Sequence, residues 1–298
     1  MSQPSNISAQ IVTDSVSESG NRITTFLLHY PRFIHAELMT HRLFSRNASS
    51  SRAIPTTNVL QQVSQFPATP EHWGKNQAGM QAYEELDVPI RAQAQQEWLL
   101  AMDSAIAHAG KMQELGCHKQ IVNRISEPFQ HINVLVTATE FANFFHLRNH
   151  PDAQPEIHML ADKMQELYEY TQPRELYEGE WHLPFLDIVK NQYKTRYYIE
   201  DNEVPLEQAL RISASACAQV SYRKNDLSIE KADMIWNKLI FSTPCHASPI
   251  EHQATPMPDF TSLQSDGVSH MDKAGKLWSG NFKGWIQYRK LIEGEAVW

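Results

Sequence analysis

The sequence predicts an α+β fold that is rich in helices around a small central mixed sheet. Three observations support this prediction. Segments with helical spacing of apolar residues dominate the chain, short β-branched and aromatic segments are scattered between them, and no internal repeat is visible. The 298 residues are 42% hydrophobic and 20% charged, which is typical of a globular protein and excludes collagen-like, low-complexity and mostly disordered chains.

The chain is predicted to begin with a polar, loosely ordered segment, residues 1–20. Residues 21–298 are expected to form one domain. β-branched and aromatic residues predict a strand over 23–34 that bends near Pro31. The elements expected next are a helix over 35–44, a long polar connection over 45–70 and a large helical region over roughly 77–115 that is interrupted at Pro89.

The second half is predicted to contain one more strand and several helices. The strand covers 132–137, and Thr137–Glu140 fits a capping box for a helix that runs to about Arg148. Further helices are expected over 154–170, 207–220 and 229–241. Residues 173–205 look irregular and are a candidate boundary between two lobes, and the tail from 243 is rich in loops, with an aromatic and basic segment over 278–290.

Charge and cysteine content restrict the functional class. With 26 Lys and Arg against 34 Asp and Glu, the net charge of −8 argues against a general nucleic-acid binder. Three cysteines without a CxxC spacing, and 14 histidines without an HExxH motif, predict neither a disulfide framework nor a metal site. The first six residues lack the features of a secretory signal, and no apolar run approaches the roughly 20 residues of a membrane span. We therefore expect a protein of the cytoplasm, without a membrane or nucleic-acid partner.

One segment has a charge opposite to that of the whole chain. Residues 38–70 contain no Asp or Glu, but they contain Arg42, Arg46 and Arg52 together with many Ser, Thr and Asn side chains. Guanidinium forks and hydroxyl or amide donors match the oxygens of a phosphate group. A phosphate site and a solvated polar loop both explain this composition.

Three blocks of residues resemble a known family. Thr40-His41-Arg42, followed after seven residues by Ser50 and then by Arg52, resembles the Arg-His-Arg signature of the flavin-dependent thymidylate synthases. Asn143–Arg148 with the following Ala-Gln-Pro-Glu, residues 153–156, resembles a second block of the family, and Arg124–Pro128 resembles a third.

Two further segments are similar to family motifs that ordinarily precede the signature. They are Ala218–Tyr222 and Ser248–His252, and here they follow it. The resemblance is therefore to a circularly permuted, phage-type relative, which would act in the cytoplasm of its host. Such a permutation is feasible where the original chain ends lie close together at the surface.

The resemblance implies a reaction, cofactors and partners. Family members are homotetramers with active sites shared between subunits. They bind FAD and convert dUMP to dTMP with methylenetetrahydrofolate and NADPH. The protein would supply binding and electrostatics, while the chemistry belongs to the flavin.

The resemblance also implies residue roles. Ser50, Arg52 and Arg124 would hold the phosphate of dUMP, and Glu37 would lie near the substrate. Arg148 would lie against the uracil and stabilise negative charge on it, which makes it the expected catalytic residue. The residues expected at FAD are His41, Arg42, Asn47, Thr137, Asn143 and His252.

Departures from the family pattern leave alternatives open. Thr40 replaces the first Arg of the signature, Glu37 stands where Gln is more usual, and Ala48 stands where an acidic residue is common. The product is therefore dTMP or another 5-substituted pyrimidine nucleotide, and a non-catalytic nucleotide-binding relative is the alternative to an enzyme. Cys245, in a Pro-Cys-His context, is a weaker candidate nucleophile, because free cysteines are more often buried small side chains.

Overall fold

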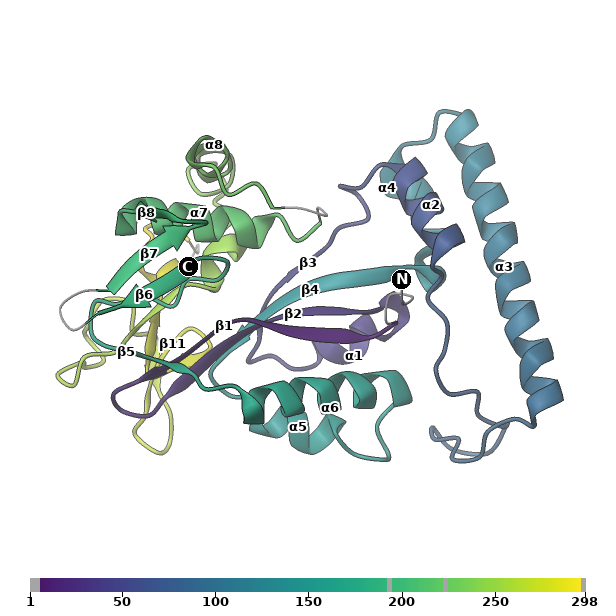
Figure 1. Cartoon of the computed structure of the whole chain (residues 1–298), viewed down its shortest axis with the longest axis horizontal. Coiled ribbons are helices and arrows are strands. Elements are labelled where there is room, and N and C mark those ends of the chain that lie inside the picture. Colours follow the sequence, from purple (N-terminus) through teal and green to yellow (C-terminus); the bar gives the residue numbers. More distant parts are fainter. Residues whose placement is uncertain (1–5, 192–194, 222–224, 296–298) are drawn as a thin grey trace.

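A five-stranded mixed sheet forms the centre of the molecule (Figure 1). The computed structural model describes residues 6–191, 195–221 and 225–295; residues 1–5 of the expected N-terminal segment and Tyr222 of the Ala218–Tyr222 motif lie outside them. The strand order is β3 (Ser45–Ala48), β4 (His131–Ala138), β2 (Arg22–Pro31), β1 (Ser8–Ser17) and β5 (Arg174–Leu176). Only the β1–β5 pair is parallel. The predicted α+β class with a small mixed sheet is confirmed.

Two helices cover one face of the sheet, α5 (Ala142–Arg148) and α6 (Pro155–Tyr170) (Figure 1). Even-numbered residues of β2 and β4, among them Phe26, Leu28 and Val134, pack there against buried side chains of α6 such as Leu160. Each such side chain contributes about 1.5–3 kcal/mol when it is fully buried.

The opposite face of the sheet is covered at two places by elements distant in the sequence. At one end lie α2 (Thr56–Gln65), α3 (Val88–Glu114) and α4 (Lys119–Val122) (Figure 1). A cluster that includes Val59 and Phe129 holds α2 and α3 together. Nearer the middle, Cys217 at the end of α7 (Leu206–Ala218) packs on Leu135 of β4. The odd-numbered side chains of β2 and β4 lie beneath these elements and between them.

Residues 6–20 do not form a loose segment, so that expectation was wrong. β1 pairs with β2 along its whole length, with one bulge at Ile11/Thr13. Ala9 and Ile11 pack against the main core, and Ser15 is buried in a hydrogen-bonded position. The sequence did not predict this strand because several of its residues are small and polar, and their burial depends on hydrogen-bond partners from elsewhere in the chain.

Four other local predictions also need correction. The helix expected over 35–44 is shorter, with a 3-10 turn η1 (Arg32–Ile34) leading into α1 (His35–Met39), and the connection over 45–70 contains β3 and α2. Pro89 does not interrupt a helix: it stands in the first turn of α3, where its missing N–H costs nothing. Thr137 lies inside β4, and the residue that precedes α5, Phe141, makes no side-chain capping bond.

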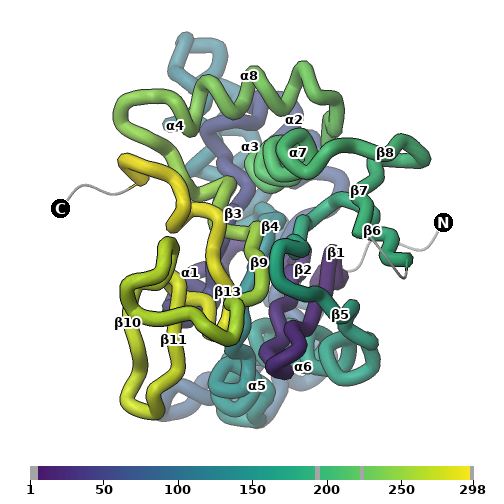
Figure 2. Tube along the Cα trace, turned by 90° about the vertical axis from the view of Figure 1, so that its left-hand side faces the viewer, coloured from purple at the N-terminus to yellow at the C-terminus, as the bar shows by residue number. Residues whose placement is uncertain are grey.

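The C-terminal half contains more strands than the sequence predicted. The segment 173–205 holds β5 and an antiparallel sheet of β6 (Asp187–Lys190), β7 (Thr195–Ile199) and β8 (Asn202–Val204), which packs on α7. α7 and α8 (Ile229–Leu239) agree with the predicted helices. The tail from 243 folds back beside the central sheet (Figure 2). Its elements are β9 (Ala254–Pro256), β10 (His270–Met271), β11 (Leu277–Ser279), β12 (Phe282–Lys283) and β13 (Trp285–Gln287).

Three further 3-10 turns belong to the described part of the chain. η2 (Glu127–Phe129) leads into β4, η3 (Ser248–Glu251) precedes His252, and η4 (Tyr288–Leu291) follows β13. Within the described residues, no helix has the length and apolar character needed to cross a membrane.

Candidate active site

The signature segment, residues 40–52, runs from the end of α1 along β3 and into the turn before α2. β3 is an edge strand that pairs only with β4 in the central sheet. Four residues of a strand span about 13 Å. The two ends of the signature are therefore presented at two separate places, one beside α5 and one beside residues 119–127.

At the first place, Arg148 at the end of α5 joins three residues of α1 and the turn after it. Its Nε donates to Nε2 of His41 over 3.0 Å, its Nη2 donates to Oγ1 of Thr40 over 3.2 Å, and its Nη1 lies 3.3 Å from Oε2 of Glu37. The side chain of Arg148 is 21% exposed. Glu37, His41 and Arg148, expected at the site from separate parts of the sequence, thus contact one another.

Burial and the nearby positive charges determine the protonation state of His41. Burial, with the charges of Arg148 and Arg46, lowers the pKa of His41 to about 4. The ring is therefore neutral at pH 7. Because an arginine can only donate, Nε2 of His41 is the acceptor and the ring proton is on Nδ1. Arg46 holds the turn from the other side by donating to the carbonyl oxygens of Met39 and His41.

One side of the Arg148 cluster reaches the surface of the protein. Arg42 lines a shallow depression together with Ala36, Met39, Thr40 and Arg46. Asn143, on the exposed side of α5, makes no side-chain hydrogen bond or ion pair with any described residue, and the same is true of Arg42. Three apolar side chains that are close in sequence to residues of this cluster, Met39, Leu43 and Leu147, are exposed.

At the second place, residues 49–54 are held against residues 119–127. The backbone N–H of Ser50 donates to Oγ of Ser221, and Nδ2 of Asn123 donates to the carbonyl oxygen of Ser51 over 2.7 Å. Arg124 lies 4.0 Å from Glu127 and its side chain is 63% exposed. Arg52 is also exposed. Ser50, Arg52 and Arg124 therefore belong to one region, residues 49–54 with Arg124, which we call the phosphate-site loop after the role that the sequence predicts for it.

A third cation lies beside this loop that the sequence reasoning missed. Nζ of Lys119, at the start of α4, donates to the carbonyl oxygen of Ala53 over 2.9 Å. No motif marked this lysine. Among the described residues, no contact joins the phosphate-site loop to the cluster around Arg148.

Thr137 and His252, both expected at FAD, lie inside the protein. Oγ1 of Thr137 is 2.8 Å from Nδ1 of His252 and 2.7 Å from Oγ1 of Thr25. This series of hydrogen bonds continues from Oγ1 of Thr25 to Nε2 of His182, and Nδ1 of His182 is hydrogen-bonded to Oγ of Ser15. Burial lowers the pKa of His252 and of His182 to about 3, so both rings are neutral. Nε2 of His252 is buried without a hydrogen-bond partner.

The two motifs that follow the signature in sequence lie beside it in space. Besides the bonds of Ser221 and His252, Nδ2 of Asn47 donates to the carbonyl oxygen of Cys217, one residue before Ala218. Asn47 thereby contacts α7, and the structure shows its amide group turned toward this helix. Residues 217–221 and 252 are thus in direct contact with β3, β4 and the turn after β3.

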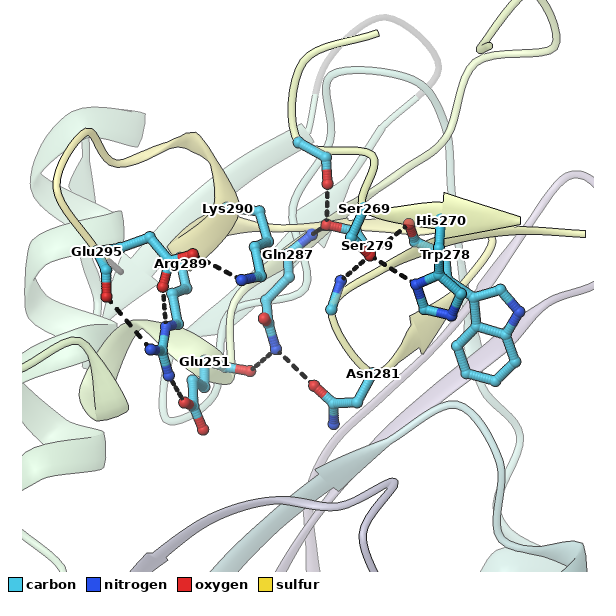
Figure 3. A network of polar contacts seen from close by, with 12 residues as sticks. Glu251, Ser269, His270, Trp278, Ser279, Asn281, Gln287, Arg289, Lys290 and Glu295 are labelled. Carbon is cyan, nitrogen blue, oxygen red and sulfur yellow. Dashed lines mark hydrogen bonds and ion pairs between the residues drawn. The ribbon is translucent and has the colours of Figure 1, made fainter. Parts of the chain in front are cut away.

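The C-terminal tail also holds the signature, through residues that the sequence reasoning left unassigned. Nε2 of Gln287, which is 2% exposed, lies within 3.1 Å of Ser45 Oγ, the Glu251 carbonyl oxygen and Asn281 Oδ1. Asn281 donates to the carbonyl oxygen of Leu43. Figure 3 shows this network continuing to Arg289, which pairs with Glu251 and Glu295.

The cysteine alternative gains no support from its surroundings. Partial burial raises the pKa of the Cys245 thiol, and Cys217 is fully buried with a raised pKa. A nucleophilic cysteine needs the opposite shift. Within the described residues, no group of His, Cys, Asp and Glu is arranged to hold a metal ion.

The comparison with protein-family profiles agrees with the sequence blocks. The profile of the family described as "Thymidylate synthase complementing protein" matches residues 21–174. No curated protein sequence matches the chain. Similar solved structures include a UMP/dUMP methylase, PolB, from Streptomyces cacaoi bound with 5-Br UMP, with 20% identity, a TM-score of 0.45, and coverage of 55% of this chain and 89% of that chain. The same methylase bound with 5-Br dUMP gives 18% identity, a TM-score of 0.44, and coverage of 55% and 90%.

Proposed function

Because this chain belongs to the thymidylate synthase complementing protein family, we propose that it is a flavin-dependent thymidylate synthase. The proposed reaction is the reductive methylation of dUMP to dTMP, with methylenetetrahydrofolate as the one-carbon donor and NAD(P)H as the reductant. The observation that carries the proposal is the contact of Arg148 with His41 and Glu37, because two separate sequence blocks meet there.

Arg148 is the proposed catalytic residue. His41 and Thr40 each accept one of its N–H groups, so the plane of the guanidinium is fixed before substrate arrives. Its third contact, Glu37, has a side chain that is 42% exposed, so this side of the guanidinium lies toward the surface. A fixed cation there would stabilise negative charge that develops on the uracil oxygens as C5 becomes nucleophilic. His41 and Thr40 act as positioning residues.

The phosphate-site loop is the proposed site for the phosphate of dUMP. Arg52, Arg124 and the hydroxyl of Ser50 offer charge-assisted hydrogen bonds to phosphate oxygens. Arg124 is only weakly engaged by Glu127, at 4.0 Å, so its donors are available to a ligand. Lys119 adds a further positive charge next to the loop.

The outward-facing residues fit an FAD, and the buried ones do not. Arg42 and Asn143 are exposed beside the neutral ring of His41, and this set of donors suits a pyrophosphate and a polar ring edge. When bound, FAD supplies the redox chemistry of the transfer. Thr137 and His252 are enclosed by protein atoms, so in this conformation they can only support the sheet beneath the site.

We propose that two chains complete each active site within a homotetramer. One chain presents the Arg148 cluster and the phosphate-site loop at opposite ends of β3, so a single nucleotide needs help from a neighbour to contact both. Exposed Met39, Leu43 and Leu147 beside the Arg148 cluster provide the apolar area that a partner chain would cover.

We also propose that the chain is circularly permuted. The family profile ends at residue 174, whereas residues 217–221 and 252 contact β3 and β4 within the matched region. Motifs that follow the signature in sequence thus occupy positions against it, which is what a change in chain order with unchanged packing produces.

One experiment tests the reaction directly. The purified protein is incubated with FAD, dUMP, methylenetetrahydrofolate and NADPH, and the nucleotide is analysed by mass spectrometry. We expect a gain of one methylene unit, about 14 Da, with a control lacking the folate showing none. A different mass gain identifies another 5-substituted pyrimidine product, and an unmodified nucleotide contradicts the proposed activity.

A non-catalytic nucleotide-binding protein is the second candidate, and Thr40 favours it. Thr40 stands where the family signature has its first arginine, so one cation that would face a flavin is missing. The colour of the protein separates the two candidates. An enzyme takes up FAD, shows flavin absorption bands and bleaches with NADPH, whereas protein that cannot be reconstituted with FAD supports the second candidate.

A further inference from the structure

A pocket of about 260 Å³ lies between the start of α6 and the long connection that joins α2 to α3, which Figure 1 shows below α2. Phe33 and residues 154–156 form one wall of the pocket, and residues between 70 and 82 form the other. None of the lining residues belongs to the Arg148 cluster or to the phosphate-site loop. The pocket is smaller than most sites for drug-sized ligands and suits a ligand of a few non-hydrogen atoms.

Hydrogen bonds hold the wall that the connection provides. The backbone N–H of Lys75 donates to the carbonyl oxygen of Glu84 over 2.7 Å, so this part of the connection closes on itself. The hydroxyl of Tyr83 donates to Oδ1 of Asp152, in the turn before α6, over 2.6 Å. The two walls of the pocket are therefore tied to each other as well as packed together.

The carboxyl group of Glu156 lines the pocket, and this residue is only 2% exposed. One of its oxygens accepts the backbone N–H of Glu71 over 2.7 Å, and the other accepts an amide N–H of Gln154. Because both oxygens accept N–H groups, Glu156 acts as a carboxylate. A carboxylate has about four acceptor positions, so each oxygen can accept a further donor.

No protein cation balances this carboxylate. Among the residues that the structure describes, no Lys, Arg or His forms a hydrogen bond or an ion pair with Glu156. The first turn of α6 contains Glu156, but the positive end of a helix offsets only about half a charge. Because buried charges in proteins are ordinarily paired with an opposite charge, the pocket is a suitable place for a cation.

The connection that forms the second wall is acidic as well. Residues 70–91 contain four Asp and Glu but only two bases, Lys75 and Arg91. Both bases form ion pairs with acidic residues of the same segment, so neither is available to Glu156. The remaining negative charge attracts cations to this part of the surface and repels anions such as a nucleotide phosphate.

The other lining residues favour an organic cation over a metal ion. Within the described residues, no group of three His, Cys, Asp or Glu side chains is arranged to hold a metal. Phe33 and Met80 add apolar surface, and an aromatic ring also attracts a nearby cation. The amide N–H of Gln81 donates to the carbonyl oxygen of Asp152, while its Oε1 accepts no hydrogen bond from a described residue. This oxygen is a second acceptor for an ammonium group.

We propose that this pocket is a binding site for a small aliphatic amine, whose ammonium group pairs with the carboxylate of Glu156. The carbon chain of the amine packs against Phe33 and Met80. The site goes beyond the proposed methylation of dUMP, because it lies apart from the residues assigned to that reaction and takes a ligand of the opposite charge.

The test uses the full-length protein at pH 7.5 with three probes of equal length, n-butylamine, n-butanol and butyrate. Titrations followed by ligand-observed saturation-transfer NMR measure their affinities. We expect saturable binding of butylamine alone, with an affinity that falls as the salt concentration rises. Absence of butylamine binding, or equal binding of butanol, overturns the proposal. Turnover of dUMP is measured separately, so failure of the amine site and failure of the proposed activity are distinguishable.

A charge-neutralising variant places the amine in the pocket. Glu156→Gln should weaken butylamine binding by about ten-fold or more, because a hydrogen bond to a charged group is lost. Glu166→Gln, at an exposed position of the same helix, is the control and should bind as the wild type does. Equal affinity in Glu156→Gln and in the wild type overturns the proposal.

Variants of Met80 keep the test valid if Glu156→Gln fails to fold, because this side chain is fully exposed. Met80→Lys should weaken butylamine binding by about two- to five-fold, and Met80→Glu should strengthen it by a similar factor, as expected for one exposed charge beside the ligand. The same two substitutions at Met271, which is 51% exposed in β10, are the controls. Equal affinity in both Met80 variants overturns the proposal.

Discussion

At the scale of single residues, Arg148 has the most defined surroundings of the predicted site residues. Two acceptors and a carboxylate hold its guanidinium, and the neutral state of His41 is essential because a protonated imidazole has no free lone pair to accept with. Glu37, which would repel a phosphate if it were unpaired, is engaged by Arg148 instead.

The first prediction concerns this guanidinium. Arg148→Ala should lower turnover by about 10²-fold or more, the effect of removing one preorganised donor at developing charge, while FAD is retained. Steady-state rates and flavin absorption measure both. Arg148→Lys keeps the charge without the fork and should recover only part of the rate. Arg91→Ala, on α3, is the control, and a rate for Arg148→Ala equal to that of this control removes Arg148 from the mechanism.

The second prediction concerns the neutral histidines. The pKa values of His182 and His252 are about 3 in the folded protein, and 6.5 is the ordinary value. Because the unfolded chain binds more protons below pH 6.5, the free energy of unfolding should fall as the pH falls from about 6.5 toward 3. The limiting slope is about 1.4 kcal/mol per pH unit for each such histidine.

Urea unfolding at a series of pH values checks this dependence. His182→Gln should lower the free energy of unfolding at pH 7.5. Between pH 6 and 4, the pH dependence of this free energy should be weaker, by the amount that corresponds to about one proton fewer taken up on unfolding. The exposed His146 is the control, and His146→Gln should leave the slope unchanged. A slope that does not change in His182→Gln would show that this ring does not titrate on unfolding.

At the scale of elements, β3 is the part on which the proposed site depends. As an edge strand it has only β4 as a sheet neighbour, and its outer surroundings come from α7 and the C-terminal tail. Gln287 and Asn281 fix the start of the strand, and Ser221 fixes the turn at its end. Elements more than 160 residues away in sequence therefore position the signature.

The third prediction tests that support. Gln287→Ala leaves buried acceptors around Ser45 without a donor and should destabilise the protein by about 1–3 kcal/mol, measured by urea unfolding. Turnover should fall as well, because the signature loses its fixed position. Gln264→Ala, at an exposed position of the same tail, is the control. Identical unfolding curves for the two variants would contradict the supporting role of Gln287.

The fourth prediction concerns the phosphate-site loop. Arg52→Ala and Arg124→Ala should each raise the KM for dUMP by about ten-fold, since a hydrogen bond from a charged group contributes about 1.5–3 kcal/mol. Both should also reduce the preference for dUMP over deoxyuridine, because only the phosphate is recognised here. Competition assays with the two ligands measure this preference. An undiminished preference in both variants places the phosphate elsewhere.

At the scale of the whole molecule, the separation of the Arg148 cluster from the phosphate-site loop limits which side chains one chain can bring to a single nucleotide. Contacts hold Arg148 beside α1 and hold the phosphate-site loop beside α4, with β3 between them. Neither place is free to move toward the other without breaking the β3–β4 pairing. This separation supports the proposal that an active site with all four arginines, Arg42, Arg52, Arg124 and Arg148, includes a neighbouring chain.

Subunit mixing provides the fifth prediction. Arg148→Ala and Arg52→Ala chains are assayed at a dUMP concentration well below the wild-type KM, where both variants are slow. They should recover part of the wild-type rate when they are unfolded together and refolded, because some shared sites then receive both arginines. Refolding each variant alone is the control. If mixing restores nothing although native mass spectrometry, with one variant labelled with 15N, shows mixed oligomers, each site is built within one chain.

The sequence by itself determined the family blocks, the α+β class and several long elements. Apolar periodicity identified β4, α6, α7 and α8, since these elements place apolar side chains on a regular face. The acid-free, arginine-bearing segment and its spacing to Ser50 led to the proposed phosphate positions, because the identity of charged side chains is visible without a fold.

Only the tertiary structure decided where those residues lie relative to one another. β1 was missed because Ser15 and similar small polar residues become strand residues only when distant partners satisfy them. The strands within 173–205 were missed because each has only three to five residues, which is too short for a clear alternating pattern. The burial of His252 and the contact of Arg148 with His41 also depend on pairing between residues more than 100 apart. Such long-range contacts leave no local periodicity in the sequence, so the packing of the sheet had to be known first.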